Sequence, residues 1–295
     1  MSVKHPVIAV TGSSGAGTTT VKNAFEHIFR RENISPLVVE GDSYHRYDRA
    51  AMKQAIAEFA EQGKQLSHFG PEANHFELID EAFKSYGETG KCRRRYYLHS
   101  VEEAAEHNAR LNTDLEPGQF TPWEEITQET DVLFYEGLHG GVVSSDADVA
   151  SHTDLLVGVV PIVNLEWIQK IHRDNAQRGY SAEAIVDTIL RRMDDYVHHI
   201  TPQFSRTDIN FQRVPTVDTS NPFIARDIPT PDESFIVIRF RDHKGADFPY
   251  LLNMIKDSFM SRPNTIVVPG GKMGFAMELI LAPRIHQLVE AKKKG

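Results

Sequence analysis

The feature that most constrains the fold is a β-branched run followed at once by glycine and hydroxyl residues. Val7–Val10 has the apolar composition of a buried strand, and a glycine-rich turn comes directly after it. A helix is then predicted to Arg31, because apolar residues recur at helical spacing: Val21, Ala24, Phe25, Ile28 and Phe29. A strand, a glycine-rich turn and a helix in this order are typical of a phosphate-binding loop.

In such a loop the backbone N–H groups curl round phosphate oxygens, and the helix dipole adds to the attraction. A turn that binds nothing is the simpler alternative, but three glycines interleaved with hydroxyl residues make it the poorer one. We therefore predict that ATP binds at Gly12, Ser13, Ser14, Gly15, Ala16, Gly17, Thr18, Thr19 and Thr20.

The loop lacks one expected residue. Gly12, Gly17 and Thr19 fit the pattern Gly-x-x-x-x-Gly-Lys-Ser/Thr, but Thr18 occupies the lysine position. That lysine normally neutralises the β- and γ-phosphates during transfer, so a kinase of this kind needs a cation from another element. Thr19 keeps the hydroxyl expected to bind magnesium.

The rest of the chain alternates strands with helices. Further strands are predicted at Leu37–Val39, Asp131–Tyr135, Leu155–Val160, Phe235–Phe240 and Thr265–Val268. Helices are predicted within 50–90, at Asn164–Arg178, at Ser181–His198 with Ser181 as the N-cap, at Tyr250–Phe259 and at Gly274–Lys293.

Five prolines between Thr201 and Ser234 predict irregular structure there. The alternation predicts an α/β fold of the P-loop kinase type, with helices on both faces of a mostly parallel, mixed sheet and extra strands near the C-terminus. We expect residues 1–295 to form one domain, with ligands bound at the carboxyl ends of the strands.

Composition excludes some classes of partner. A formal net charge of -9 argues against nucleic acid as the main partner. A single cysteine, Cys92, cannot form a disulfide within the chain, which fits a reducing compartment. The sequence contains no apolar run of about 18 residues and does not begin like a signal peptide, so a soluble cytoplasmic protein without a membrane partner is expected.

Two carboxylates follow predicted strands at the ligand-binding edge. Asp42, in Glu40-Gly-Asp42, is placed to accept a proton from an acceptor hydroxyl and to orient it, although an Asp in a turn would look the same. Glu136 ends an apolar strand beside the phosphate loop, where it could coordinate magnesium or serve as a cap.

Cations gather in two further segments. Helical spacing places Lys170, Arg173, Asp174 and Arg178 on one stripe, either as a solvated face or as a lid whose cations replace the missing loop lysine. Lys91-Cys-Arg-Arg-Arg95 is either a solvated charge run or a site for a phosphorylated acceptor.

Taken together, these segments resemble the bacterial phosphoribulokinases, which are related to uridine kinase among the P-loop kinases. The resemblance extends over nearly the whole chain, through five blocks: Val7–Thr18, Glu40–Asp42, Phe134–Gly140, Val160–Lys170 and Asn210–Pro215. It implies transfer of the γ-phosphoryl of ATP, with magnesium, to the 1-hydroxyl of ribulose 5-phosphate, giving ribulose 1,5-bisphosphate for carbon fixation in the Calvin cycle. The lysine-free loop is a mark of this bacterial type.

The resemblance also assigns roles. Asp42 resembles the catalytic base, Asp174 a second essential acid near the metal, and Glu136 the acidic residue beside the nucleotide. Lys170 and Arg173 resemble the cations that serve the phosphates. Together with Thr19, the magnesium side would include Asp42 and Glu136. Contacts on the substrate side are implied for His45, Arg49, Tyr97, His99 and Arg178.

This bacterial type is generally activated by NADH and forms a large homo-oligomer. The resemblance places the corresponding effector arginines at Arg31, Arg239 and Arg262.

Three other functions stay open. A kinase of the same fold could act on a nucleoside, although a neutral nucleoside does not need the basic cluster at Lys91–Arg95. The acceptor could be another sugar phosphate. A regulatory protein that senses ATP without transfer would be expected to lack the base or the lid cations, and both Asp42 and Lys170 are present.

Overall fold

The computed structural model describes residues 4–12 and 18–294 of the chain. Its main sheet is a mixed one of eight strands in the order β2-β5-β1-β6-β7-β8-β10-β9 within that described part. The strand bounds are β1 Val7–Gly12, β2 Pro36–Glu40, β5 Val132–Gly137, β6 Leu155–Val160, β7 Ile209–Pro215, β8 Ser234–Phe240, β9 Phe259–Arg262 and β10 Thr265–Pro269.

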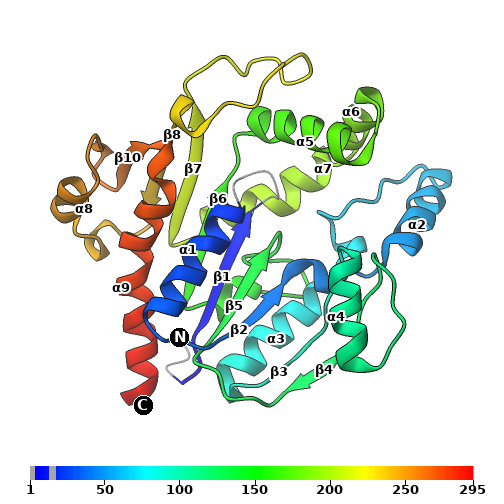
Figure 1. Cartoon of the computed structure of the whole chain (residues 1–295), viewed down its shortest axis with the longest axis horizontal. Helices are drawn as coiled ribbons and strands as arrows, with labels where there is room; N and C mark the ends of the chain where they lie inside the picture. Colours follow the sequence, from blue (N-terminus) through cyan, green and yellow to red (C-terminus); the bar gives the residue numbers. More distant parts are fainter. Residues whose placement is uncertain (1–3, 13–17, 295) are drawn as a thin grey trace.

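The first five strands of that order are parallel, and the last three pair antiparallel. β1 lies between β5 and β6, with Val10 opposite Glu136 on one side and Val157 on the other. All six residues of β1 are buried, as expected for a strand covered on both faces. The carboxyl ends of the parallel strands therefore lie together on one edge of the sheet (Figure 1).

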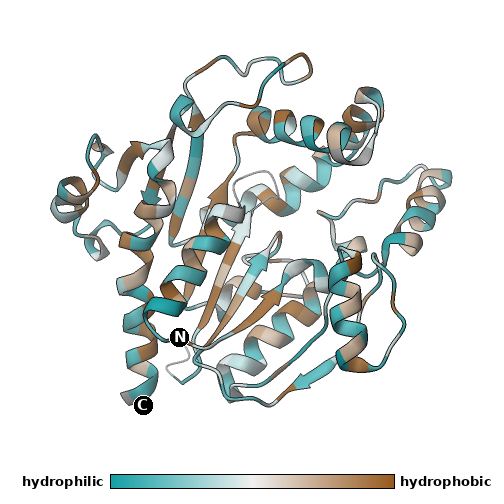
Figure 2. Cartoon of the chain, viewed as in Figure 1, coloured by the Kyte–Doolittle hydropathy of each residue, from teal (hydrophilic) through white to brown (hydrophobic). Residues whose placement is uncertain are grey.

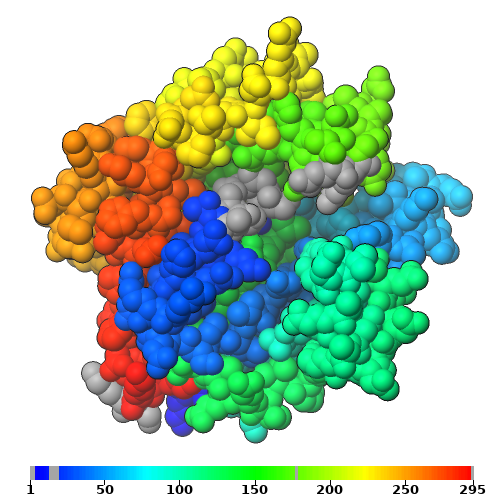
Figure 3. All heavy atoms as spheres, in the orientation of Figure 1, coloured from blue at the N-terminus to red at the C-terminus, as the bar shows by residue number. Residues whose placement is uncertain are grey.

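Helices cover both faces of the sheet, as predicted. On one face α1 (Thr18–Arg31) and α9 (Met273–Lys294) lie side by side, and Figure 3 shows them in blue and red on the same side of the molecule. On the other face α3 (Phe76–Thr89) packs against the alternate residues of the strands. Figure 2 shows β1, β2 and β5 as largely apolar strands and the helices as mixtures of polar and apolar residues.

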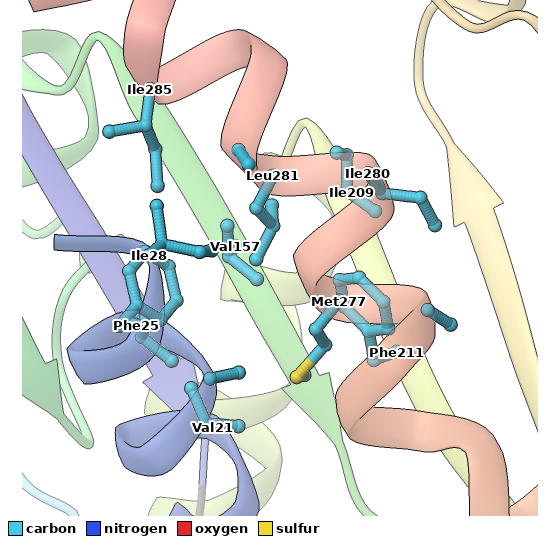
Figure 4. Close-up of a cluster of buried hydrophobic side chains, with 14 of the residues drawn as sticks. Val21, Phe25, Ile28, Val157, Ile209, Phe211, Met277, Ile280, Leu281 and Ile285 are labelled. Atoms are coloured by element: carbon cyan, nitrogen blue, oxygen red, sulfur yellow. The ribbon is translucent and has the colours of Figure 1, made fainter. Parts of the chain in front are cut away.

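The larger core fills the space between α1, α9 and the sheet. Side chains from α1, β6, β7 and α9 meet there in Figure 4: Val21, Phe25, Ile28, Val157, Ile209, Phe211, Met277, Ile280, Leu281 and Ile285. Because strand side chains alternate, Ala9 of β1, Tyr135 of β5 and Leu156 of β6 point the other way, into the second core on the α3 face.

A smaller unit flanks the β2 edge. It contains α2 (Arg49–Glu61), α4 (Val101–Leu111) and a two-stranded antiparallel sheet of β3 (Cys92–Arg94) and β4 (Glu124–Ile126), all on the right in Figure 1. Beyond the carboxyl ends of the parallel strands lie α5 (Val163–Arg178), α6 (Ala182–Arg191) and the short α7 (Met193–Asp195). A further helix, α8 (Phe248–Met254), lies beside the antiparallel strands.

The structure corrects several predicted elements. Residues 201–234 are not irregular throughout, because β7 continues the parallel sheet there; its only proline, Pro215, ends the strand. The helix predicted at Tyr250–Phe259 stops at Met254, and Phe259 begins β9. The helical segment within 50–90 is two helices, and Arg192 separates α6 from α7. Ser181 is the predicted N-cap and accepts a hydrogen bond from the N–H of Ala184.

Within residues 4–12 and 18–294, none of the helices is both long and apolar enough to cross a membrane.

The core gives a direct stability prediction. Phe211 is fully buried between the sheet and α9, so Phe211→Ala should lower the free energy of unfolding by about 3–5 kcal/mol through lost burial and a new cavity. The matched variant Phe275→Ala removes a ring that is 45% exposed on α9 and should change it by about 0.5 kcal/mol or less. Urea unfolding followed by circular dichroism measures both, and equal losses would contradict this packing.

Candidate active site

A cleft of about 190 Å³ opens at the carboxyl ends of β1, β2 and β5. It is lined by Gly12, Glu40, Gly41, Asp42, His99, Glu136, Gly137 and Leu138. Gly12 is the last residue of β1 and the first of the predicted phosphate loop. The next five loop residues, 13–17, lie outside the described part of the chain, as do the side chains of Thr18 and Thr19.

Close backbone packing sets the floor of this cleft. A Cβ on Gly41 would lie 2.8 Å from the Cα of Gly137, and one on Gly137 would lie 2.7 Å from the Cα of Gly41. Each would also come within 2.7 Å of the Tyr135 hydroxyl oxygen. Glycine at both positions is therefore required for the ends of β2 and β5 to approach, and this approach brings Asp42 near Glu136.

Asp42 is held between two histidines. Its Oδ1 lies 3.2 Å from Nε2 of His45, and its Oδ2 lies 3.7 Å from Nε2 of His99. Burial opposes the charge of Asp42, but the hydrogen bond and charge of His45, with a smaller contribution from His99, lower the pKa of this carboxyl well below its usual range. Asp42 is therefore an ionised carboxylate at the mouth of the cleft, suited to orient a hydroxyl and take its proton.

The predicted substrate-side residues differ in how far they are exposed to solvent. His45 is buried, and its second ring nitrogen, Nδ1, lies 2.7 Å from Oδ1 of Asn74, so both nitrogens are engaged within the protein. Tyr97 packs edge-on against the rings of His45 and His99, and His99 is 45% exposed. His99 can therefore reach a ligand, whereas both ring nitrogens of His45 are already engaged by Asp42 and Asn74.

Glu136 belongs to a second acidic group in the same cleft. It lies opposite Glu40 in the register of β5 and β2. Burial, followed by the charge of Glu40, raises the pKa of Glu136 to about 7, so this carboxyl is partly protonated at neutral pH and a nearby cation would favour its ionised form. Among the described residues no group of three acidic, histidine or cysteine side chains could hold a metal. Magnesium would fit here only if phosphate oxygens completed its coordination, as they commonly do.

The cations of α5 gather around one buried carboxylate. Asp174 accepts hydrogen bonds from Nζ of Lys170 and from Nε of Arg173, the latter at 3.1 Å. Burial alone would raise the pKa of Asp174, but these two cations lower it. The structure thus brings three of the four predicted stripe residues into one ion cluster. The side chain of the fourth, Arg178, lies outside the part that can be described.

The three arginines of the basic segment are bound to the protein itself. Arg93 lies near Glu81 and Glu125, and Arg94 donates to the carbonyl oxygen of Val38. Arg95 donates to the carbonyl oxygens of Ser43 and His45, both at 2.6 Å, and stacks on Phe120 and Trp123. The interpretation of this segment as an arginine fork for a phosphorylated acceptor is therefore not supported, and Arg95 instead braces the backbone that follows Asp42.

The remaining predicted site residues are spread over the molecule. Arg49 begins α2, donates its N–H to the carbonyl of Gly118 and packs over that glycine. Arg31 pairs with Glu278 of α9. Arg239 and Arg262 share a row across β8, β10 and β9, on the sheet face opposite the α1–α9 core. One chain therefore does not bring the three arginines together.

Sequence reasoning missed several residues that shape the cleft. Glu40 lines it, and its place at the end of a predicted strand was the available signal. Gln203 is buried and joins two strand ends: its Oε1 accepts from Thr11 and from the N–H of Gly141, and its Nε2 donates to the carbonyl of Leu138. Nothing in the local sequence marks Gln203, because its partners are distant in the chain.

Comparison with known proteins agrees with this architecture. The sequence model of the phosphoribulokinase / uridine kinase family matches residues 7–220. The chain is 60% identical to the chromosomal phosphoribulokinase of Cupriavidus necator, over 100% of this chain and 99% of that protein. It is 59% identical to a probable phosphoribulokinase of Escherichia coli K12, over 99% of both.

A solved structure extends the comparison to the fold. The phosphoribulokinase from Rhodobacter spheroides superposes with a TM-score of 0.89 at 53% identity, covering 99% of each chain. The match includes the antiparallel strands that follow residue 220. On the family match and on this identity over full length, the chain belongs to the phosphoribulokinase / uridine kinase family.

Proposed function

We propose that this protein transfers the γ-phosphoryl group of ATP to the 1-hydroxyl of ribulose 5-phosphate, giving ribulose 1,5-bisphosphate and ADP in the Calvin cycle. The observation that carries the proposal is the ionised Asp42 in a cleft that begins at Gly12, the first residue of the phosphate loop. The phosphoribulokinases that match this chain over its whole length support the choice of acceptor.

In this proposal the ATP phosphates lie on residues 12–20 and the acceptor hydroxyl lies against Asp42. As the hydroxyl oxygen bonds to phosphorus, its proton passes to an oxygen of Asp42, and ADP leaves with the electrons of the broken P–O bond. Lys170 and Arg173 are assigned to neutralise the phosphates in place of the absent loop lysine, with Asp174 holding both cations in position. Arg49, Tyr97, His99 and Arg178 are assigned to the acceptor.

Magnesium is assigned to the Glu136 side of the cleft, together with Thr19 and the nucleotide phosphates. Bound magnesium neutralises charge on the transferred phosphoryl group. The raised pKa of Glu136 supports this choice, because a buried carboxyl beside Glu40 gains most from a cation. Asp42 was also predicted as a ligand, but its two histidine partners favour the role of base.

A nucleoside acceptor is the second candidate. It gains weight because Arg93, Arg94 and Arg95 contact protein groups, so they no longer favour an anionic acceptor. Uridine is therefore the acceptor to compare with ribulose 5-phosphate.

With magnesium and ATP, the protein should phosphorylate ribulose 5-phosphate faster than uridine, and Asp42→Asn should lower kcat by about 10²–10⁴-fold because the proton acceptor is lost. ATP affinity, measured by calorimetry, should stay within about threefold. The control Asp114→Asn changes an exposed aspartate in the segment between α4 and β4 and should leave kcat unchanged. Faster turnover on uridine would rule out the proposed acceptor.

Glu136→Gln should raise the stability of the protein at high pH while lowering its activity. A carboxyl whose pKa is raised in the folded state holds its proton more tightly there than in the unfolded chain, so its ionisation costs stability as the pH rises from about 4.5 towards 7. The variant should therefore be more stable than the parent at pH 8, by up to about 3 kcal/mol, and equal to it near pH 4.

Urea unfolding without nucleotide or magnesium measures this difference, and the same variant should lose activity. Glu26→Gln, at an exposed position of α1, should change stability by less than about 0.5 kcal/mol at either pH. A less stable Glu136→Gln protein at pH 8 would contradict the assignment.

We also propose a cytoplasmic homo-oligomer of one-domain chains, activated by NADH. The free, buried Cys92 supports a reducing compartment, and the one sheet shared by β1 and β10 supports a single domain. Arg31 lies on the opposite face from Arg239 and Arg262, so an effector site using all three needs more than one chain.

NADH titrated from micromolar to millimolar should raise the initial rate, and Arg31→Ala should abolish the rise because the effector loses a cation. The neighbouring exposed cation gives the control, Arg30→Ala, which should respond like the parent. Because NADH is the effector under test, the assay should not itself use pyridine nucleotides. It can instead follow a labelled phosphate group in the product. A flat response of the parent protein would remove the effector proposal.

A further inference from the structure

A buried asparagine outside the predicted site contacts the partner of Asp42. Asn74 is 1% exposed and follows a short 3-10 turn at Pro71–Ala73. Its backbone forms an antiparallel bridge with His45, flanked by a hydrogen bond from the N–H of His75 to the carbonyl of Tyr44 at 2.9 Å. The segment before α3 is thereby fixed against the segment that follows Asp42.

The side chain of Asn74 can take only one orientation. Its Nδ2 lies 2.9 Å from the carbonyl oxygen of His68 and 2.7 Å from that of Gly70. Carbonyl oxygens only accept hydrogen bonds, so the amide nitrogen has to face them; the flipped amide would place oxygen against two oxygens. The carboxamide oxygen Oδ1 therefore faces Nδ1 of His45, 2.7 Å away.

This orientation fixes the protonation of the histidine ring. Since Oδ1 of Asn74 can only accept, Nδ1 of His45 has to carry a proton and donate it. The other ring nitrogen, Nε2, lies 3.2 Å from Oδ1 of the ionised Asp42, which also can only accept, so Nε2 donates as well and both ring nitrogens carry protons. The ring also packs against His68, with ring centroids 4.5 Å apart, which limits its rotation.

We propose that Asn74 is a positioning residue for phosphoryl transfer: it fixes Nδ1 of His45 as the donor and so directs Nε2 at the catalytic carboxylate of Asp42. The inference rests on the proposed role of Asp42. Outer partners that orient metal-ligating side chains commonly contribute about 10–100-fold to activity or affinity, and we expect a loss of similar size when Asn74 is removed.

The first test reads the protonation of Nδ1 of His45 in the unmodified protein. Nitrogen-15 spectra of histidine-labelled protein distinguish protonated from unprotonated ring nitrogens, and the His45 signals are assigned by their loss in His45→Gln. We expect Nδ1 of His45 to be protonated. An unprotonated Nδ1 would overturn the inference, even if no Asn74 variant folds.

The second test compares three variants. Asn74→Leu should lower kcat by about 10–100-fold with the KM for ATP within about twofold, and should remove the proton from Nδ1 of His45. Asn74→Asp keeps an acceptor for Nδ1 of His45, so it should keep the protonated Nδ1 and more of kcat than Asn74→Leu, but its second oxygen faces the carbonyl oxygens of His68 and Gly70 and should lower stability. The control Asn108→Leu removes a similarly bonded amide, which donates to Leu115 and accepts from Thr113, and should change neither readout.

The outcomes separate this inference from the proposed function. If Asp42→Asn keeps full activity, the role of Asp42 is wrong. If Asp42→Asn is inactive but Asn74→Leu keeps both kcat and the protonated Nδ1, the positioning role of Asn74 is wrong. A loss of kcat in Asn74→Leu that Asn108→Leu matches would show only a general loss of packing, and would also contradict it.

Discussion

The parallel pairing of β1 between β5 and β6 is the interaction on which the rest of the structure depends. Because the strands run in the same direction, they end at one edge, and each delivers a different group there: Gly12 from β1, Glu136 from β5 and, through β2, Asp42. The two cores on either face of the sheet hold these strands in register. A shift of one residue would turn every strand side chain to the wrong face.

The cleft places two carboxyl groups, Asp42 and Glu136, close together, and the proposed chemistry explains why. The pKa values of these two carboxyls are shifted in opposite directions. Histidines lower the pKa of Asp42, whereas burial and Glu40 raise the pKa of Glu136. Carboxyls whose surroundings shift their pKa values in opposite directions are suited to different tasks. Here the separation fits a proton acceptor on one side and a cation site on the other.

Much of the fold was predictable because local sequence patterns indicate its strands and helices. The buried run of β1 and the amphipathic pattern of α1 are short-range signals, and Ser181 is an N-cap within its own helix. The prediction of irregular structure is wrong at β7, because the prolines of this segment lie outside the strand or at its end and do not prevent it from forming. It also missed β3 and β4, each of three residues, which are too short to show periodicity.

The sequence by itself determined the residue types of the site and their order along the chain, since Asp42, Glu136 and the glycines each follow a recognisable strand. Only the tertiary structure decided what these residues touch. Arg95 contacts backbone carbonyls rather than a ligand, and the two nitrogens of His45 are taken by Asp42 and Asn74. Such contacts depend on segments that folding brings together, and no local pattern encodes the direction of a hydrogen bond between them.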